Sequence, residues 1–298
     1  MGFHWPPLGF TCVSAASGND ANSCHCTQPC RSFHRAHDQT LSDGQVTVLD
    51  PGDYGTLTIT KSISIVNDSG GAASIMVSGG AVGVLVNAPA SGYVNLRGLT
   101  IQGVGFGGGT GVGLNTAFSF TMENCVVRNH TNRGIFLAPS VNSQISISNT
   151  LVADNGGRAG IELQAEGSAA VIANFNGVEL YNNSGAGLFA NGGVSQGGTV
   201  SVTVTDSVAA NNTGVGGISG GFSVHTVTAP TTLTLVRSVA TRNGIGLAAD
   251  QPSVMRVGQS VVTANTTSWS GLGVQSYGDN YINGNGDNDP APPFVAPK

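Results

Sequence analysis

Residues 124–155 decide the fold of this chain, and their sequence is NCVVRNHTNRGIFLAPSVNSQISISNTLVADN. A short apolar core leads into a polar turn that contains Asn. The next strand then begins with Gly, an apolar residue and a variable residue. An alternating polar and apolar run comes next, and then the apolar core returns. Such alternation is typical of half-buried β-strands, so the segment describes a turn of strands and corners.

The same pattern occurs at least six times along the chain. Its seven-residue segments begin at Arg97, Asn124, Asn149, Asn176, Asp206, Arg237 and Gln259. Their third residues are Leu99, Val126, Leu151, Val178, Val208, Val239 and Val261, and their seventh residues are Gly103, His130, Asn155, Asn182, Asn212, Asn243 and Asn265. Successive seventh residues are 27, 25, 27, 30, 31 and 22 positions apart. A repeat of this length indicates a solenoid.

Composition and period together select the class of solenoid. Val, Ile, Thr and Ser dominate the repeats, and no run of ten residues within them has helical periodicity. A loose repeat near 27 residues with Gly and Asn at its corners predicts an all-β fold, a single right-handed parallel β-helix with three sides. Right-handed crossovers are the default between parallel strands.

Equivalent residues of successive coils in such a fold stack about 4.8 Å apart. We therefore expect one inward apolar ladder from Leu99 to Val261. We also expect an Asn ladder at a corner, because Asn tolerates left-handed backbone and its amide can bond the neighbouring turns. His130 falls in the Asn column, where it is either a polar substitute at a corner or a functional histidine.

The overall composition excludes several classes of protein. The 298 residues include 45 Gly, only 9% charged residues and 6% aromatic residues, and the net charge is −5. No basic block is interleaved with aromatic residues, so we expect no nucleic-acid partner. No apolar run approaches 18 residues, so we expect no transmembrane segment. We expect a monomer.

The pattern divides the chain into four parts. Residues 1–12 are interpreted as a leader or an expression remnant, although 1–10 lack the basic and apolar regions of an intact secretion signal. Residues 13–50 are expected to form an N-terminal cap, 51–275 the parallel β-helix, and 276–298 a closing coil with a Pro-rich tail. The cap should contain a helix at 31–41 with Phe33, Ala36 and Leu41 facing inward and His34 and His37 on its surface.

Five cysteines occur, three of them within seven residues of the cap. A disulfide between Cys24 and Cys30 is the simplest pairing there. Free thiols and a zinc site are the alternatives, but this spacing is not a standard zinc pattern. Cys125 lies within a repeat and is expected to be a small core residue.

Several segments resemble a known group of proteins. They are 24–33, containing PCRSF, then LDPGDYG at 49–55, ITKSISI at 59–65, LRGLTI at 96–101 and SYGDN at 276–280. Over roughly 13–290 the chain is similar to exported bacterial right-handed parallel β-helix proteins of the pectin-lyase-like superfamily. The resemblance implies export and the β-helix fold. It transfers no catalytic residues, because the motif series of polygalacturonases and pectate lyases are absent from this sequence.

A candidate site lies on the strands that restart after each polar turn. Their outward column is expected to contain Gly113, Phe136, Glu162, Phe189, Ser219 and Ala248. Phe136 and Phe189 would flank Glu162, so exposed aromatic rings could stack on sugar faces with a carboxylate between them. The alternative is a solvent-exposed ladder, or a surface that a loop covers. Glu162→Gln is expected to leave the fold intact.

Two reactions are open on such a face. Glycoside hydrolysis needs two carboxylates, which Glu162 could form with Asp154, Glu166 or Glu179. β-Elimination from a uronic acid needs a base and a cation beside the substrate carboxylate. The cations could come from Arg128, Arg133 or Arg158, and His130 is a further binding candidate.

The sequence therefore predicts an exported, secreted or surface-located protein that cleaves a polysaccharide, either as a lyase or as a glycoside hydrolase. The alternative is a non-catalytic solenoid that binds polysaccharide or serves in adhesion. No cofactor is expected, although calcium could bind near Asp279, Asp287 and Asp289, which lack an EF-hand pattern. His225 has no acidic partner in the sequence around it.

Overall fold

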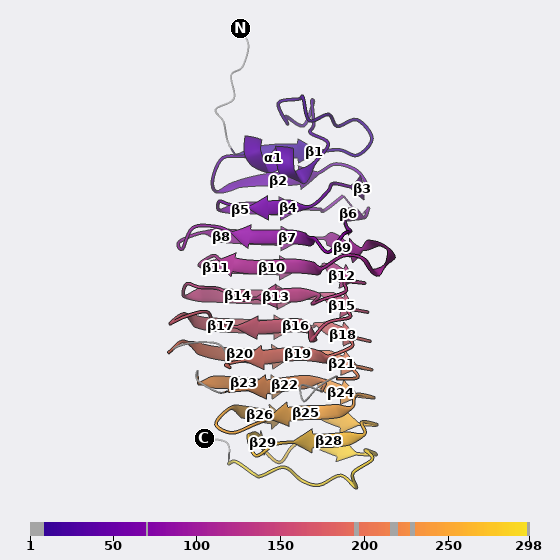
Figure 1. The fold of residues 1–298 in the computed structure, drawn as a ribbon, viewed down its shortest axis with the longest axis vertical. Coiled ribbons are helices and arrows are strands. Elements are labelled where there is room, and N and C mark those ends of the chain that lie inside the picture. The colour runs from indigo at the N-terminus through magenta and orange to yellow at the C-terminus, as the bar shows by residue number, and fades with distance from the viewer. Residues whose placement is uncertain (1–8, 70, 194–196, 215–219, 227–229, 297–298) are drawn as a thin grey trace.

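The strands wind into a right-handed parallel β-helix, which confirms the predicted fold. The computed structural model describes residues 9–69, 71–193, 197–214, 220–226 and 230–296. Successive coils stack along the long axis from the N-terminal cap to the C-terminal coil (Figure 1). Each complete coil contributes one strand to each of three parallel sheets.

Sheet 1 is the longest of the three in the described residues. Its strands are β1 (Phe10–Val13), β2 (Gly44–Val48), β5 (Ile63–Val66), β8 (Tyr93–Arg97), β11 (Ser119–Glu123), β14 (Ser143–Ser148), β17 (Ala170–Asn176), β20 (Thr199–Thr205), β23 (Thr231–Val236), β26 (Val254–Gly258) and β29 (Val274–Ser276). Its inward residues are apolar and its outward residues are mostly Ser, Thr and Asn, as in β20.

Sheet 2 follows sheet 1 in each coil and has the shortest strands. They are β3 (Gly52–Asp53), β6 (Ala73–Val77), β9 (Leu99–Gly103), β12 (Val126–Arg128), β15 (Leu151–Ala153), β18 (Glu179–Tyr181), β21 (Val208–Ala210), β24 (Val239–Thr241), β27 (Val261–Thr263) and β30 (Tyr281–Asn283). A 3-10 turn, η1 (Val104–Phe106), follows β9.

Sheet 3 completes each coil and carries the predicted outward column. Its strands are β4 (Leu57–Ile59), β7 (Val82–Asn87), β10 (Thr110–Thr116), β13 (Ile135–Leu137), β16 (Ala159–Gln164), β19 (Ala186–Asn191), β22 (Phe222–His225), β25 (Ile245–Ala249) and β28 (Thr267–Ser270). None of the described helices has the length and apolarity that crossing a membrane would need.

The inward ladder of sheet 2 is not the expected one. Five of its seven expected members, from Val126 to Val261, lie in a half-buried column, and Leu99 and Val178 are buried one position before that column. Val126, Leu151 and Val208 pair in one column that is only half-buried. The buried column is formed by the following residues, which are Ile101, Val127, Val152, Leu180, Ala209, Ala240 and Val262. Three-residue strands with two adjacent apolar residues do not show in sequence which of the two points inward.

Left-handed corners bracket these short strands and explain the error. Asn124 and Asn129 both have positive φ, and so do the equivalent pairs Asn149 and Asp154, Gly177 and Asn182, Asp206 and Asn211, Arg237 and Arg242, and Gln259 and Ala264. The segments that were expected to begin at Arg97 and Asn176 therefore begin at Gly98 and Gly177. Glycine takes the left-handed conformation there without the steric cost of a Cβ atom.

The Asn ladder is present, but it lies just after the second corner. Its members are Asn155, Asn183, Asn212, Asn243, Asn265 and Asn285, so Asn183 replaces the predicted Asn182. Each side-chain amide donates to the Oδ1 of the next coil; from Asn212 to Asn243 the distance is 3.0 Å. From Asn183 onward, each amide also donates to a sheet 2 carbonyl of the previous coil, as Asn212 does to Leu180. The ladder thus pairs polar groups that the core has cut off from water.

A second ladder, made of hydroxyl groups, lines the corner between sheets 1 and 2. Ser207, Ser238 and Ser260 are buried there. The backbone N–H of Ser207 donates to the Ser238 hydroxyl at 3.2 Å, and Ser238 repeats this contact with Ser260 at 3.1 Å. Each hydroxyl donates back to the carbonyl two residues earlier. Cys125 occupies this column and is a buried free thiol, as the sequence predicts for a small core residue.

His130 ends the Asn ladder on its N-terminal side. Its backbone N–H donates to Asn155 Oδ1, and its Nε2 lies 3.3 Å from the carbonyl of Ile101. A carbonyl only accepts, so Nε2 carries the proton and His130 takes the place of a ladder amide. Burial lowers the pKa of His130, and the hydrogen bond to Ile101 opposes this shift only in part. The histidine is therefore neutral and structural.

Helix α1 (Phe33–Gln39) covers the N-terminal end of the coils (Figure 1). Ser32 is its N-cap and accepts from the backbone N–H of Arg35 at 3.2 Å. Phe33 and Ala36 are buried as predicted, but Leu41 is exposed. His37, expected on the surface, is buried and its Nε2 accepts from the backbone N–H of Thr60. The helix ends at Gln39, before Leu41, so Leu41 does not belong to its inward face.

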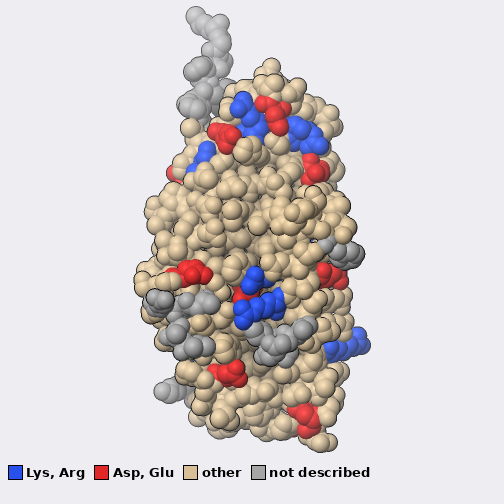
Figure 2. Space-filling model, in the orientation of Figure 1, with Lys and Arg blue, Asp and Glu red and all other residues tan. Residues whose placement is uncertain are grey.

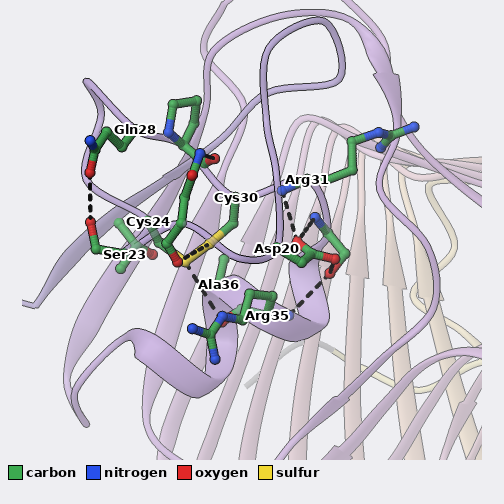
Figure 3. The surroundings of a disulfide bond; sticks show 12 residues. Asp20, Ser23, Cys24, Gln28, Cys30, Arg31, Arg35 and Ala36 are labelled. Carbon is green, nitrogen blue, oxygen red and sulfur yellow. Dashed lines mark hydrogen bonds between the residues drawn. A yellow bond between two sulfur atoms is a disulfide. The ribbon is translucent and has the colours of Figure 1, made fainter.

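Two disulfides fasten the cap. One joins Cys24 to Cys30, the pairing that the sequence suggests, and it lies over helix α1 near Ala36 (Figure 3). The other joins Cys12 to Cys26 and was not expected. Strand β1 begins at Phe10 and pairs with β2, so residues 10–12 form part of sheet 1. The rest of that proposed leader, residues 1–8, lies outside the described residues.

The aspartates near the C-terminus are engaged within the protein. Asp287 accepts from the backbone N–H and hydroxyl of Ser268, and Asp289 accepts from Asn285 at 2.8 Å. Asp279 accepts from the backbone of Gln259. Within the described parts of the chain, no three His, Cys, Asp or Glu side chains converge on a metal position.

Replacing Asn212 by Ala should destabilise the whole β-helix. The change removes the buried acceptor shared by the backbone and side-chain amides of Asn183, and the side-chain donor to the carbonyl of Leu180. We expect a loss of about 2–4 kcal/mol in the free energy of unfolding, measured by chemical denaturation. Asn174→Ala, at an exposed position of β17, is the matched control and should change little. Equal effects of the two substitutions would contradict a structural role of the ladder.

His130→Asn should reduce the acid sensitivity of the fold. Because folding lowers the pKa of His130, its stability contribution is complete above about pH 6.5 and is lost as the pH falls below that value. An asparagine can donate to Ile101 without titrating. The thermal midpoint of the wild type should therefore fall more between pH 7.5 and 5 than that of the variant. His37, whose pKa burial also lowers, remains in both proteins. Parallel pH curves would rule out this role.

Candidate functional site

The predicted outward column of sheet 3 is present in the structure. Phe136 of β13 pairs with Glu162 of β16, and Glu162 pairs with Phe189 of β19. Gly113 precedes Phe136 in the same register. Ser219 lies outside the described residues, and the residue paired with Phe189 is Ser223, followed by Ala248. One carboxylate thus lies between two aromatic side chains on adjacent coils.

Glu162 is buried, contrary to the expectation of an exposed carboxylate. Its side chain has 0% exposed area because two arginines cover it. Arg133 donates from Nε to Oε2, and Nη1 of Arg158 lies 3.5 Å from Oε1. The side-chain amide of Asn191 donates to Oε1 at 3.1 Å. A buried carboxylate is stable only with such partners, so Glu162 holds the arginines in place.

Each arginine also covers one of the aromatic rings. The guanidinium carbon of Arg133 lies 4.4 Å from the ring centroid of Phe136, and that of Arg158 lies 5.1 Å from that of Phe189. Both distances fall within cation–π range. Phe189 is buried and Phe136 half-buried, so they are not free stacking platforms. We call Arg133, Phe136, Arg158, Glu162 and Phe189 the arginine clamp.

The arginine clamp leaves one positive charge exposed on a weakly charged face. Its two guanidinium groups face one carboxylate, and the Arg158 side chain is 42% exposed. Figure 2 shows Lys and Arg side chains gathered over β16 and β19, with mostly uncharged surface around them. This arrangement is suited to an anion such as a carboxylate, which guanidinium groups bind through paired hydrogen bonds.

A second outward column, two residues further along the same strands, was missed by the sequence analysis. Gln164 of β16 pairs with Asn191 of β19, and Asn191 pairs with His225 of β22. Asn191 donates to both Glu162 and Gln164, and Gln164 donates to Glu166. The alternation of β16 could have revealed this column, because residues 162 and 164 point to the same side of the strand.

Arg128 and Asp154 meet on a different side of the coil. Arg128 lies on β12 in an outward column of sheet 2, and its Nη2 donates to Asp154 Oδ2 at 2.9 Å. Asn182 donates to the other oxygen of Asp154. The outward position of Arg128 follows from ordinary strand alternation in β12. Glu162 contacts neither residue, so Arg128 and Asp154 form a separate pair.

Glu179 and His130 also lie apart from the arginine clamp. Glu179 is exposed on β18, in the sheet 2 column of Leu151. His130 is buried at the corner as part of the Asn ladder. The predicted site residues therefore do not form one site. Phe136, Phe189, Arg133, Arg158 and Glu162 come together, Arg128 pairs with Asp154, and Glu179 and His130 each lie elsewhere.

Comparison with solved structures supports the fold. Pectate lyase Pel9A superimposes with a TM-score of 0.65 and 16% sequence identity over 95% of this chain and 81% of that chain. A rhamnogalacturonan lyase gives a TM-score of 0.49 at 13% identity, covering 86% of this chain and 74% of that one. A lacto-N-biosidase from Eubacterium ramulus gives 0.40 at 11% identity, with 96% and 67% covered.

At these identities the likeness shows the fold alone, and only the first of the three is close enough to support it. Comparison with protein-family models and with curated protein sequences gives no match. The site must therefore be interpreted from its own geometry.

Glu162→Gln should lower stability without abolishing the fold. The amide can accept from one arginine but turns its NH₂ group toward the other, so we expect a loss of about 1–3 kcal/mol in unfolding free energy. Thermal unfolding followed by circular dichroism would measure it. Glu179→Gln is the matched control at an exposed position and should be near neutral. A loss no larger than that of the control would mean that Glu162 does not hold the clamp.

Proposed function

We propose that this protein is an exported, carbohydrate-active β-helix protein that binds an acidic polysaccharide across sheet 3 and cleaves it by β-elimination. The observation that carries the proposal is the arginine clamp, because its partly exposed guanidinium groups exceed the buried carboxylate by one positive charge. A uronate carboxylate is an anion that such a pair of guanidinium groups would bind. The long face of parallel strands provides room for a chain of sugars.

Two further features agree with this proposal. The fold is shared with pectate lyase Pel9A, although at 16% identity this supports the fold and not the activity. The two disulfides of the cap are typical of proteins that function in oxidising compartments outside the cytosol.

Elimination is favoured over hydrolysis by the state of the carboxylates on this face. Hydrolysis needs two carboxyl groups beside the scissile bond, one of which donates a proton. Glu162 is buried beneath two cations, and Glu166 accepts from Gln164. Elimination instead requires a cation beside the substrate carboxylate, which Arg158 or Arg133 provides. Because the carboxylates of Glu162 and Glu166 are both occupied by hydrogen bonds, a second candidate is a solenoid that binds polysaccharide without cleaving it.

Arg158→Ala should weaken binding of polygalacturonate about tenfold or more, equal to about 1.4 kcal/mol. Glu162 keeps Arg133 and Asn191 as partners, so the fold should survive. Isothermal titration calorimetry would measure the affinity, and ultraviolet absorbance of the new double bond would measure cleavage.

Arg256→Ala is the matched control, because Arg256 lies on β26 in sheet 1, away from the clamp. Its affinity should equal that of the wild type. Equal affinity of all three proteins, or preference of the wild type for a neutral polysaccharide, would contradict the proposal. Binding without unsaturated products would support the second candidate.

A further inference from the structure

A histidine and an aspartate form a pair on the same outward face as the arginine clamp. His225 ends strand β22, and Asp250 follows strand β25 in the next coil. His225 Nδ1 and Asp250 Oδ2 are 3.1 Å apart. The two side chains are 37% and 65% exposed, so a ligand on this face can reach them. The sequence around His225 gave no sign of this partner, because 25 residues separate the two.

The strand register places His225 beside the arginine clamp. It pairs with Asn191, which lies two residues after Phe189 on β19. Residues two apart on a strand point to the same side, and adjacent strands are about 4.8 Å apart. His225 is thus the diagonal neighbour of Phe189, the ring beneath Arg158, at a separation of about 8 Å between side-chain origins. Asn191, the register partner of His225, also donates to Glu162 of the arginine clamp.

The partner of His225 fixes the chemistry of its ring. An ionised carboxylate only accepts hydrogen bonds, so Nδ1 carries the proton that faces Asp250. In the neutral imidazole this leaves the lone pair on Nε2. A carboxylate in this position both orients the ring and stabilises the imidazolium that forms when Nε2 takes up a proton. His225 is therefore arranged as a base.

We propose that His225 is the general base of the elimination reaction and that Asp250 is its positioning residue. This inference rests on the proposed function, since it requires a uronate whose carboxylate is held by Arg158. The proton removed in β-elimination is on the carbon bonded to that carboxylate, C5 of the sugar. His225 lies one coil beyond Phe189, the ring that Arg158 covers, so the base and this guanidinium lie over neighbouring coils of one face.

The step balances without a cofactor. Nε2 of His225 takes the proton from C5, and the electrons of that bond form a double bond between C4 and C5. The bond from C4 to the glycosidic oxygen breaks, and its electrons remain on the leaving oxygen. That oxygen takes a proton from water, and the imidazolium then returns a proton to the solvent. Arg158 stabilises the negative charge that builds up on the carboxylate during the first step.

The chain contains a matched pair for comparison. His34 and Asp38 on helix α1 also form an exposed His–Asp contact, at 3.7 Å, far from sheet 3 at the N-terminal cap. A merely solvated ion pair would behave alike in both places, because exposed pairs contribute little to stability. Only the pair beside the arginine clamp should affect turnover.

The test uses the full chain with polygalacturonate and follows the absorbance of unsaturated products. His225→Gln should lower kcat about 100-fold or more, with KM, polygalacturonate affinity and thermal midpoint unchanged. Asp250→Asn should lower kcat by a smaller factor. His34→Ala should leave kcat unchanged. Free imidazole should restore part of the activity of a His225→Ala variant, which a structural role would not allow.

The outcomes separate this inference from the proposed function. If the wild type cleaves and Arg158→Ala weakens binding, but His225→Gln keeps kcat within about threefold, His225 is not the base and the proposed function stands. If the wild type binds but does not cleave, the base assignment is overturned and binding alone remains. If the wild type neither binds nor cleaves, both proposals are overturned.

Discussion

The structure depends on hydrogen bonds to the polar groups that are buried beside the corners of each coil. A coil must turn three times, and at two of its corners the residue beside the turn is buried, where water cannot satisfy the backbone. The Asn ladder solves this at one corner and the hydroxyl ladder at the other. Both ladders join one coil to the next by hydrogen bonds. The buried polar groups, which would be costly if unpaired, therefore also hold the coils in register. The apolar ladders can then fill the interior at fixed spacing.

This fixed register is also what creates the site. Glu162, Phe136 and Phe189 come from segments about 26 residues apart and meet only because their strands pair without a shift. The arginines that cover Glu162 come from the turns just before β13 and β16, and their guanidinium groups fold back over the strands. Rigid strands thus supply the carboxylate and rings, while the shorter turns supply the cations. Such support by strands gives a binding face with little conformational freedom to lose.

The repeat length, the corners and the sheet 3 column could be predicted because each recurs in successive segments of the sequence. The details that could not be predicted are those that change when a strand is shifted by one residue. Two adjacent apolar residues in β12 and its equivalents hide which one points inward, and Asn182 beside Asn183 hides which one enters the ladder. The burial of Glu162 depends on the paths of two arginine side chains, which no periodicity encodes. The partner of His225 was hidden because coils of unequal length separate it from Asp250.

The Asn ladder has one more consequence, which follows from its direction. One N–H of every side-chain amide from Asn155 to Asn285 donates toward the C-terminal side, so the amide dipoles align head to tail. The positive end of this stack meets the carboxylate of Asp289, and the hydrogen bonds from Asn285 lower the pKa of that group. The ladder is therefore a polarised column closed by an anion, as a helix N-terminus is by a carboxylate. If one amide flipped its NH₂ and C=O groups, its NH₂ would face the NH₂ of a neighbour. The direction of the ladder could therefore reverse only if every amide flipped together.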